Sequence, residues 1–318
     1  MLLLAEINIR AGAAQPAIED LERLLARQPK AAAALVLLGS AYLAKREPVR
    51  AIEVYRRLAA LAPGFVDPLP QLVALSFAEK QPDQALERVK NQAALLPKSA
   101  THRFLMGEAD LPRREGKPAE AASLQAIALD PRLAGPDLQL GRLYAASGQF
   151  DQALAKVGEA LKGNPKNVGA LMLAGVIHEQ RGEISKAREL YEKVLAVSPR
   201  FAPAANNLAW ILSEHGGDKD RALALAQTAK ELVPEDPQVS DTLGWILYRR
   251  GVHQRALALL KDSAAKLPGN PQIQYHLGMV SAQLGDKDAA RQALSIAAAA
   301  PAPFPGQDEA RKALATLK

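Results

Sequence analysis

The 318-residue sequence predicts an all-α solenoid of about nine stacked helical hairpins. The composition is 48% hydrophobic but only 4% aromatic, which suits short, closely packed helices better than a strand-rich core. Prolines recur every 34 or 35 residues, at Pro29, Pro63, Pro97, Pro131, Pro165, Pro199, Pro234 and Pro268. Alanines recur in the same register, at Ala17, Ala51, Ala85, Ala119, Ala153, Ala187, Ala222, Ala256 and Ala290. Such a period indicates two-helix units that bury their apolar faces by stacking on their neighbours.

Residues 35–63 show how one unit is built. Apolar residues recur at helical spacing in two segments, 35–42 and 52–61, and the charged turn 45–48 separates them. This pattern predicts a helical hairpin that ends at Pro63, because proline disfavours helical geometry in the residue before it.

Small residues recur in the first helix of most units, and larger apolar residues recur in the second. A glycine inside a helix costs about 1 kcal/mol relative to alanine, so its recurrence implies that two helices cross closely there. The large side chains are expected to fill the space between successive units. The small residues are Ala5, Gly39, Gly107, Gly141, Gly175, Ala209, Gly244 and Gly278, with Val73 as the exception. The large residues are Leu21, Tyr55, Val89, Val157, Tyr191, Leu260 and Leu294.

Glycines and acids mark the turns between helices. A second set of glycines is expected to end the first helices in a left-handed conformation. The acid pairs 218–220 and 286–288 lie at equivalent turns, where capping of a helix start explains them better than a cation site does. The turn glycines are Gly12, Gly148, Gly182, Gly216, Gly251 and Gly285.

The chain divides into a continuous solenoid over residues 1–300 and a proline-rich break with a capping helix over 301–318. Residue 1 falls inside a first helix, so the first unit is expected to be incomplete and the chain to be a fragment of a longer array. The unit at 101–131 carries Asp110 and Ser123 in columns that are otherwise large and apolar, and we expect it to pack least well.

These columns resemble the tetratricopeptide repeat family over nearly the entire chain. The clearest matches are in two units, at Leu38, Gly39, Tyr42, Ala51, Tyr55 and Pro63, and at Leu140, Gly141, Tyr144, Ala153, Ala160 and Pro165. The resemblance implies a right-handed superhelix whose first helices line a concave groove for a peptide or protein partner. The carboxylate-clamp subtype is not matched, since the aligned positions carry Val36, Ser40, Asp67 and Gln71.

Placed in that register, the last three units direct polar and aromatic side chains into the groove. Aromatic rings, arginine and asparagine are typical of peptide-binding hot spots. The alternative is that Trp210 and Trp245 pack between units as core. The expected partner-binding residues are Asn206, Asn207, Trp210, Asp241, Trp245, Tyr248, Arg249, Tyr275, His276 and Met279.

The sequence offers no clear seat for catalysis. It lacks phosphate-binding glycine loops, a zinc-protease motif and a serine-hydrolase motif. The S-x-x-K match at 263–266 stands alone, and the five histidines do not cluster at metal-ligand spacing. We therefore expect no catalytic residue, no cofactor and no metal.

The charge and hydropathy patterns limit the partners. The net charge is +6, but 40 basic residues are interleaved with 34 acidic ones, so we expect no nucleic acid partner. No stretch is apolar enough to span a bilayer, so direct membrane insertion of this chain is not expected.

Residues 206–210 and 241–248 resemble large bacterial tetratricopeptide proteins of envelope and exopolysaccharide systems, including repeat lipoproteins associated with PEP-CTERM protein sorting. This resemblance implies a non-catalytic scaffold in a periplasmic or envelope setting, with a cytoplasmic one left open. Two alternatives stay open. One is the substrate-recruiting arm of a larger enzyme such as a glycosyltransferase, and the other is self-association through the open N-terminal face.

Overall fold

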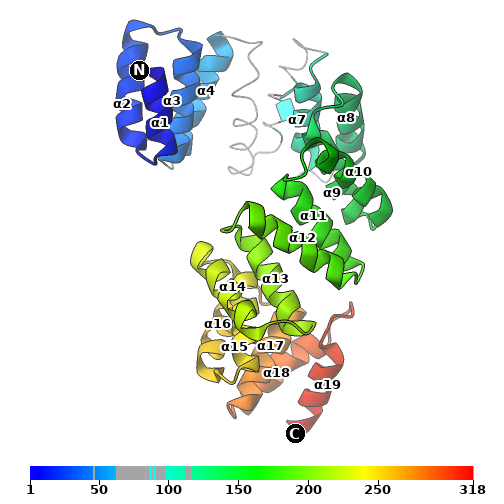
Figure 1. The fold of residues 1–318 in the computed structure, drawn as a ribbon. Helices are drawn as coiled ribbons and strands as arrows, with labels where there is room; N and C mark the ends of the chain where they lie inside the picture. Colours follow the sequence, from blue (N-terminus) through cyan, green and yellow to red (C-terminus); the bar gives the residue numbers. More distant parts are fainter. Residues whose placement is uncertain are drawn as a thin grey trace. The chain divides into compact units, whose positions relative to one another are not determined.

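The computed structural model describes residues 1–45, 47–61, 83, 86–87, 89–90, 98–111 and 116–317. Their contacts group into two compact units, residues 1–165 and 166–318, and each is considered by itself. All regular structure in these described ranges is helical, which confirms the all-α class (Figure 1).

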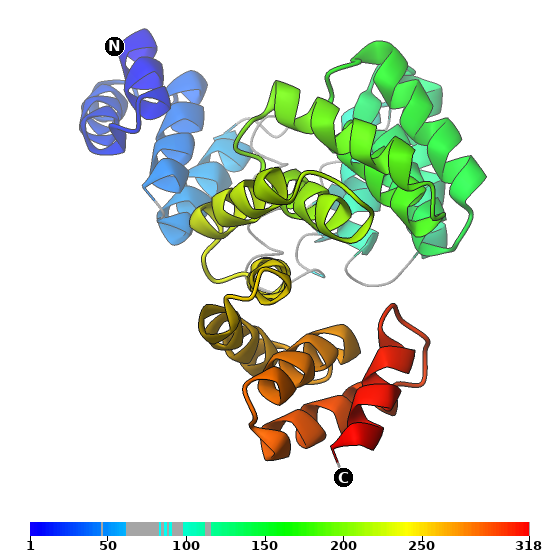
Figure 2. The same cartoon turned by 60° about the horizontal axis from the view of Figure 1, so that its bottom comes forward.

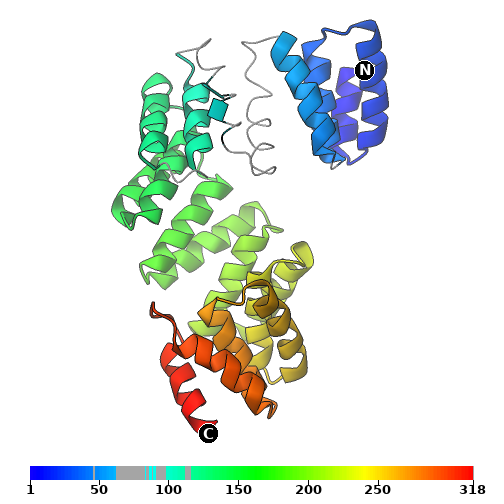
Figure 3. The same ribbon diagram turned by 180° about the vertical axis from the view of Figure 1, so that it is seen from behind.

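The described residues of the first unit form three complete hairpins besides the one at its start. Its helices are α1 (Leu2–Arg10), α2 (Ala14–Arg27), α3 (Ala32–Ala44), α4 (Pro48–Leu61), α7 (Ala100–Asp110), α8 (Gly116–Leu129), α9 (Ala134–Ala146) and α10 (Phe150–Gly163). Figure 3 shows α1 to α4 as neighbouring rods, and Leu21, Leu35 and Tyr55 lie in their shared core. The hairpin expected over residues 66–97, with Pro63, Val73, Ala85 and Pro97, lies almost wholly outside the described residues.

The second unit contains four hairpins and a final helix. Its helices are α11 (Val168–Gln180), α12 (Ile184–Val197), α13 (Ala202–Glu214), α14 (Lys219–Leu232), α15 (Pro237–Arg249), α16 (His253–Lys266), α17 (Pro271–Gln283), α18 (Lys287–Ala298) and α19 (Gln307–Thr316).

The two small-residue columns are buried, as the sequence predicts. The eight described column alanines of the second helices are at most 1% exposed. In the first helices, a Cβ atom built on Gly175 would lie 2.5 Å from Tyr191 Cε1, and one on Gly278 would lie 2.5 Å from Leu294 Cγ. Both glycines therefore make room for the large side chain of their own hairpin. These large side chains fill space within a hairpin as well as between successive hairpins.

The turn chemistry follows the sequence. Gly182 has a φ angle of 74°, which only glycine adopts readily, and the other five turn glycines share this conformation. Asp218 Oδ1 accepts hydrogen bonds from the backbone nitrogens of Asp220 and Arg221 at 2.9 and 3.0 Å, and Asp286 Oδ1 accepts one from Ala289 at 3.1 Å. The capping interpretation of both acid pairs is confirmed.

Polar contacts replace apolar ones in the unit at 101–131. Ser123 is fully buried, and its hydroxyl bonds to the backbone oxygen of Ala119 at 2.9 Å and to the side chain of Gln139. Gln139 is also fully buried and donates to Glu108 Oε1 at 3.2 Å. A side chain from the following hairpin thus occupies the space that a larger residue fills in other units.

The last helix, α19, follows the proline-rich segment and packs along α18 and α17 (Figure 2). Gly306 has a φ angle of 100°, and a Cβ atom there would lie 2.5 Å from the ring of Tyr275. Arg291 Nη2 donates to the backbone oxygen of Leu317 at 2.6 Å, which ties the far end of α19 to α18.

Candidate functional site

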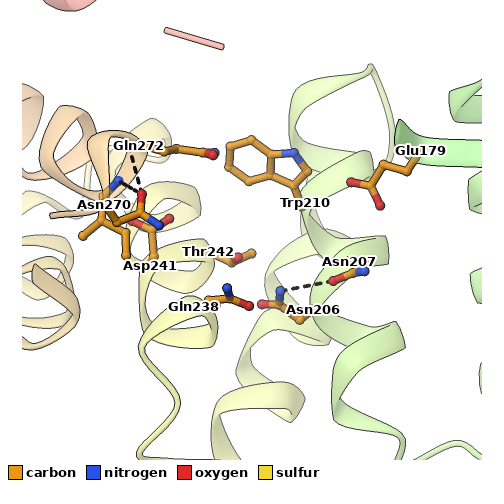
Figure 4. Close-up of a pocket in the computed structure, with 10 residues that line it drawn as sticks. Glu179, Asn206, Asn207, Trp210, Gln238, Asp241, Thr242, Asn270 and Gln272 are labelled. Atoms are coloured by element: carbon orange, nitrogen blue, oxygen red, sulfur yellow. Dashed lines mark hydrogen bonds between the residues drawn. The ribbon is translucent and has the colours of Figure 1, made fainter. Parts of the chain in front are cut away.

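Two cavities of the second unit share the side chain of Trp210. Together we call their lining the Trp210 groove. The first cavity has a volume of about 260 Å³ and is lined by Glu179, Asn206, Asn207, Trp210, Gln238, Asp241, Thr242, Asn270, Gln272 and Ile273 (Figure 4). The second has a volume of about 340 Å³ and is lined by Trp210, Glu214, Trp245, Arg249, Tyr275, His276, Pro305, Gly306 and Glu309.

The first helices of successive hairpins supply most of this lining, and side-chain caps fix the starts of α15 and α17. Asp236 Oδ1 accepts from the backbone nitrogen of Gln238 at 2.8 Å, and Asn270 Oδ1 accepts from that of Gln272 at 3.0 Å. A proline follows each cap, where its missing N–H is not needed. Gln238 and Gln272 therefore sit in the first turns of α15 and α17, beside the first cavity (Figure 4).

A stack of rings forms the floor of the second cavity. The ring of Trp245 stacks on His276 at 4.1 Å and on Tyr248 at 5.0 Å between centroids. Trp245 is 7% exposed and donates through Nε1 to Glu214 Oε1 at 3.1 Å. His276 is 1% exposed, and its Nδ1 lies 2.8 Å from Asp241 Oδ1. Trp245 is therefore part of the core, as in the alternative that places the tryptophans between repeats. It joins the first helices of three hairpins, α13, α15 and α17.

Trp210 differs from Trp245 because it is only half-buried. It projects from α13 toward Gln272 of α17 (Figure 4), and its ring centroid is 5.7 Å from that of His276. Lying on the lining of both cavities, it is the aromatic surface that a bound molecule would meet.

A hydrogen-bonded chain of three residues closes one side of the first cavity. Asn207 Nδ2 donates to the hydroxyl oxygen of Tyr191 at 3.1 Å, and that hydroxyl donates to Glu179 Oε2 at 2.6 Å. Burial raises the pKa of Glu179, and the bond from Tyr191 opposes this effect. Burial, and then the bond to Glu179, raise the pKa of Tyr191. The hydroxyl of Tyr191 therefore stays protonated and acts as a fixed donor.

Several polar groups around the first cavity are left without partners. The Oδ1 atom of Asn206 is buried and accepts no hydrogen bond within the described structure. The side-chain amides of Gln238 and Gln272 likewise make no hydrogen bond to the described residues. A buried polar atom without a partner costs stability, so Asn206 Oδ1 is suited to a ligand that supplies a donor. Gln238 is exposed and Gln272 is half-buried, so their amides are accessible to the same ligand.

The second cavity combines an arginine with two carboxylates. Arg249 Nη1 donates to the backbone oxygen of Ser213 at 2.9 Å and pairs with Glu214. Burial, and then the carboxylate of Glu309, raise the pKa of Tyr275 to about 12. Tyr275 is therefore neutral at physiological pH.

The structure brings eight of the ten expected groove residues to these cavities. Tyr248 and Met279 line neither one and pack against the aromatic cluster beside them. Several lining residues were not expected although they lie one helical turn from expected ones, such as Glu214 after Trp210 and Gln238 before Asp241. Helical spacing could have identified these residues. It also missed Pro305, Gly306 and Glu309, because no repeat pattern places the C-terminal segment beside Tyr275.

The isolated S-x-x-K motif has a structural explanation. Ser263 is buried, and its hydroxyl donates to the backbone oxygen of Pro237 at 2.7 Å. Lys266 Nζ bonds to Glu235 and Asp262 at 2.8 and 3.1 Å, which raises its pKa. Both side chains are held by α15, α16 or the turn that precedes α15, so neither is poised as a nucleophile or base.

Within the described ranges, no three histidine or acidic side chains gather closely enough to hold a metal ion. Nor does any described helix have both the length and the apolar character that crossing a bilayer requires.

The fold is that of an α-solenoid, and the first helices of its second unit line two cavities. Two models of the tetratricopeptide repeat match the sequence, one at residues 2–64, 138–196 and 242–305 and the other at 179–246. Because these ranges cover more than half of the chain, the protein belongs to the tetratricopeptide repeat family.

Individual relatives match only parts of the chain. A TPR repeat-containing protein of Pseudomonas aeruginosa is 30% identical over 103 residues, 32% of this chain and 18% of that protein. A probable UDP-N-acetylglucosamine–peptide N-acetylglucosaminyltransferase SPINDLY of Hordeum vulgare is 32% identical over 110 residues, 34% of this chain and 12% of that protein. The matched segments thus span less than a fifth of these relatives.

A solved structure supports the fold over nearly the full length. The crystal structure of the APC/C hetero-tetramer Cut9–Hcn1 is similar with a TM-score of 0.75, covering 96% of this chain and 59% of that one. At 16% sequence identity, the similarity concerns the fold alone.

Proposed function

We propose that this protein is a non-catalytic interaction scaffold that binds an extended peptide segment in the Trp210 groove. Membership of the tetratricopeptide repeat family supports a protein-interaction role. One observation carries the site: a half-buried tryptophan lines two cavities, and the first of them also contains the buried, unpartnered Oδ1 atom of Asn206 and the amide of Gln272. Amides pair with an extended backbone while an aromatic ring removes it from water, which is the chemistry of groove recognition.

The test is a selection of displayed random peptides on the whole chain, followed by affinity measurement with variants. Replacing Trp210 by alanine should weaken a selected peptide about tenfold or more, because hot-spot tryptophans contribute about 2 kcal/mol. Leu124→Ala is the matched control, since Leu124 is 46% exposed on α8 and outside the groove. Circular dichroism checks that both variants keep their helices. Equal binding by both variants, or no enriched peptide, would refute the proposal.

The proposed setting is an assembly of the bacterial envelope, exopolysaccharide export or protein sorting. The resemblance of residues 206–210 and 241–248 to such scaffolds supports it. Identification of proteins that co-purify with the native, full-length protein tests this setting, and partners from unrelated processes alone would contradict it.

A second candidate is the recruiting arm of a larger enzyme such as a glycosyltransferase. The partial similarity to the SPINDLY protein favours it. The coding sequence on either side of residues 1–318 in the source genome distinguishes the two, because this candidate requires a catalytic domain in the same polypeptide.

A third candidate is self-association through the N-terminal helix. Leu3 and Leu4 of α1 are 70% and 53% exposed, and Ile7 is 53% exposed. Exposed apolar side chains on one helix favour association. Light scattering over a wide concentration range tests it, and a monomer throughout would exclude it.

A further inference from the structure

The Trp210 groove carries a charge opposite to that of the whole protein. The chain has a formal net charge of +6. Four carboxylates line the groove, while its described lining contains one arginine and one histidine as basic side chains. No arginine or lysine is among the described residues that line the first cavity. The carboxylates belong to Glu179, Asp241, Glu214 and Glu309.

Two of these carboxylates are already matched by the protein. Glu214 pairs with Arg249 and accepts from Trp245 Nε1, and Asp241 contacts Nδ1 of His276. These contacts hold neighbouring first helices together, so they are not free to meet a ligand's charge.

The other two carboxylates form no ion pair in the described structure, although His215 lies near enough to Glu179 to act on its charge. Glu179 borders the first cavity, and its described hydrogen bond comes from the neutral hydroxyl of Tyr191. Glu309 borders the second cavity in the exposed first turn of α19, and the described structure gives it no ion pair. Both lie on cavities that Trp210 also lines, so each cavity offers a carboxylate without an ion pair together with the ring of Trp210.

Resting on the proposed peptide binding, we propose that the groove selects basic peptide segments and places an arginine or lysine side chain against Trp210. Tryptophan is the aromatic side chain that attracts cations most strongly, and a nearby carboxylate adds a charge-assisted hydrogen bond. The buried, unpartnered Oδ1 atom of Asn206 gives the peptide backbone or the basic side chain a further acceptor. An acidic tail would instead meet like charges in both cavities.

The first part of the test uses the composition of the peptides selected on the whole chain. We expect enrichment of arginine and lysine and depletion of aspartate and glutamate. In one selected peptide, changing its basic residue to glutamine should weaken binding at least tenfold. Peptides that bind through Trp210 but are neutral or acidic would overturn this inference and leave the proposed function standing. Failure of all peptides to bind would overturn both.

The second part uses protein variants with matched charge changes. Glu309→Lys and Glu309→Gln should each weaken the selected basic peptide, by about tenfold and threefold. Glu189→Lys is the control, since Glu189 is exposed on α12 outside the groove and changes the net charge equally. Equal effects of Glu309→Lys and Glu189→Lys would indicate nonspecific attraction and overturn the inference. Hydrogen exchange of α19 checks that the Glu309 variants keep this helix docked.

Discussion

The same substitution, glycine to alanine, should have opposite effects at two helical positions. At Gly175 in α11, the new Cβ would lie 2.5 Å from Cε1 and 2.9 Å from Cδ1 of Tyr191. Carbon atoms prefer separations of about 3.5–4.0 Å, so the ring would have to move by roughly 1 Å. At Gly158 in α10, no atom lies within 4 Å of the new Cβ.

The magnitudes follow from what holds Tyr191. Its side chain is fully buried, and its hydroxyl bonds to Glu179 and Asn207 at 2.6 and 3.1 Å. Overpacking costs about 1–3 kcal/mol, a lost bond to a charged group adds about 1.5–3 kcal/mol, and alanine regains about 1 kcal/mol of helix propensity. We therefore expect Gly175→Ala to lower the free energy of unfolding by about 1.5–5 kcal/mol, the lower end applying if the Tyr191 ring shifts only slightly. Gly158→Ala should raise it by about 0.5–1 kcal/mol.

Urea denaturation followed by far-ultraviolet circular dichroism measures the free energies. Repeat proteins do not always unfold in two states, so hydrogen exchange should accompany it. Protection should fall in α11 and α12 of Gly175→Ala and stay unchanged there in Gly158→Ala. Shifts of the same sign and size in both variants would refute the close-crossing argument.

Three other outcomes are expected. Ala187→Leu should destabilise the protein by about 1–3 kcal/mol, because Ala187 is fully buried. Lys186→Ala should change stability by less than about 0.5 kcal/mol. Equal shifts of the thermal unfolding midpoint in the two variants would contradict the assignment of the alanine column to the core. Burial raises the pKa of Glu179, so the folded state binds this proton more tightly than the unfolded state does, and the free energy of unfolding falls as the pH rises from 4.5 through the raised pKa. Glu179→Gln should flatten this slope in denaturation measured from pH 4 to pH 8. An unchanged slope would count against the role of Glu179. Trp245→Ala should cost about 3–5 kcal/mol by calorimetry or urea unfolding, clearly more than the half-buried Trp210→Ala, and the reverse order would be inconsistent with the ring stack.

Most of the fold follows from the sequence because the repeat period fixes both helices and their contacts. One column position determines burial at its equivalents, as Ala187 and Ala256 show. The period could not foresee the contact of Ser123 with Gln139, because two unusual residues compensate each other only when their hairpins are stacked. Single-column reasoning treats Ser123 as a defect, whereas the structure gives it a partner.

The candidate site follows from the sequence only in part. Register placed Asn206, Trp210 and Asp241 on one surface, since first helices repeat their orientation. It could not separate Trp210 from Trp245, because they occupy nearly the same place in successive units and differ only in what the next hairpin puts against them. The contribution of Glu309 depends on how the chain turns back after residue 300, which lies outside the repeat.

In four hairpins the helix glycine and the bulky side chain beside it come from the same hairpin, as in Gly175 with Tyr191 and Gly278 with Leu294, whereas Gly107 faces Gln139 of the next hairpin. Duplication or loss of one of these 34-residue repeats would therefore move the glycine together with the large side chain that packs on it, and would leave no cavity. Contacts such as that of Asn207 with Tyr191 run from one hairpin to the next, so exchanging either repeat would break them. We therefore expect a change in repeat number to cost more stability at the junction of α12 and α13, which this bond spans, than at a junction without a polar contact.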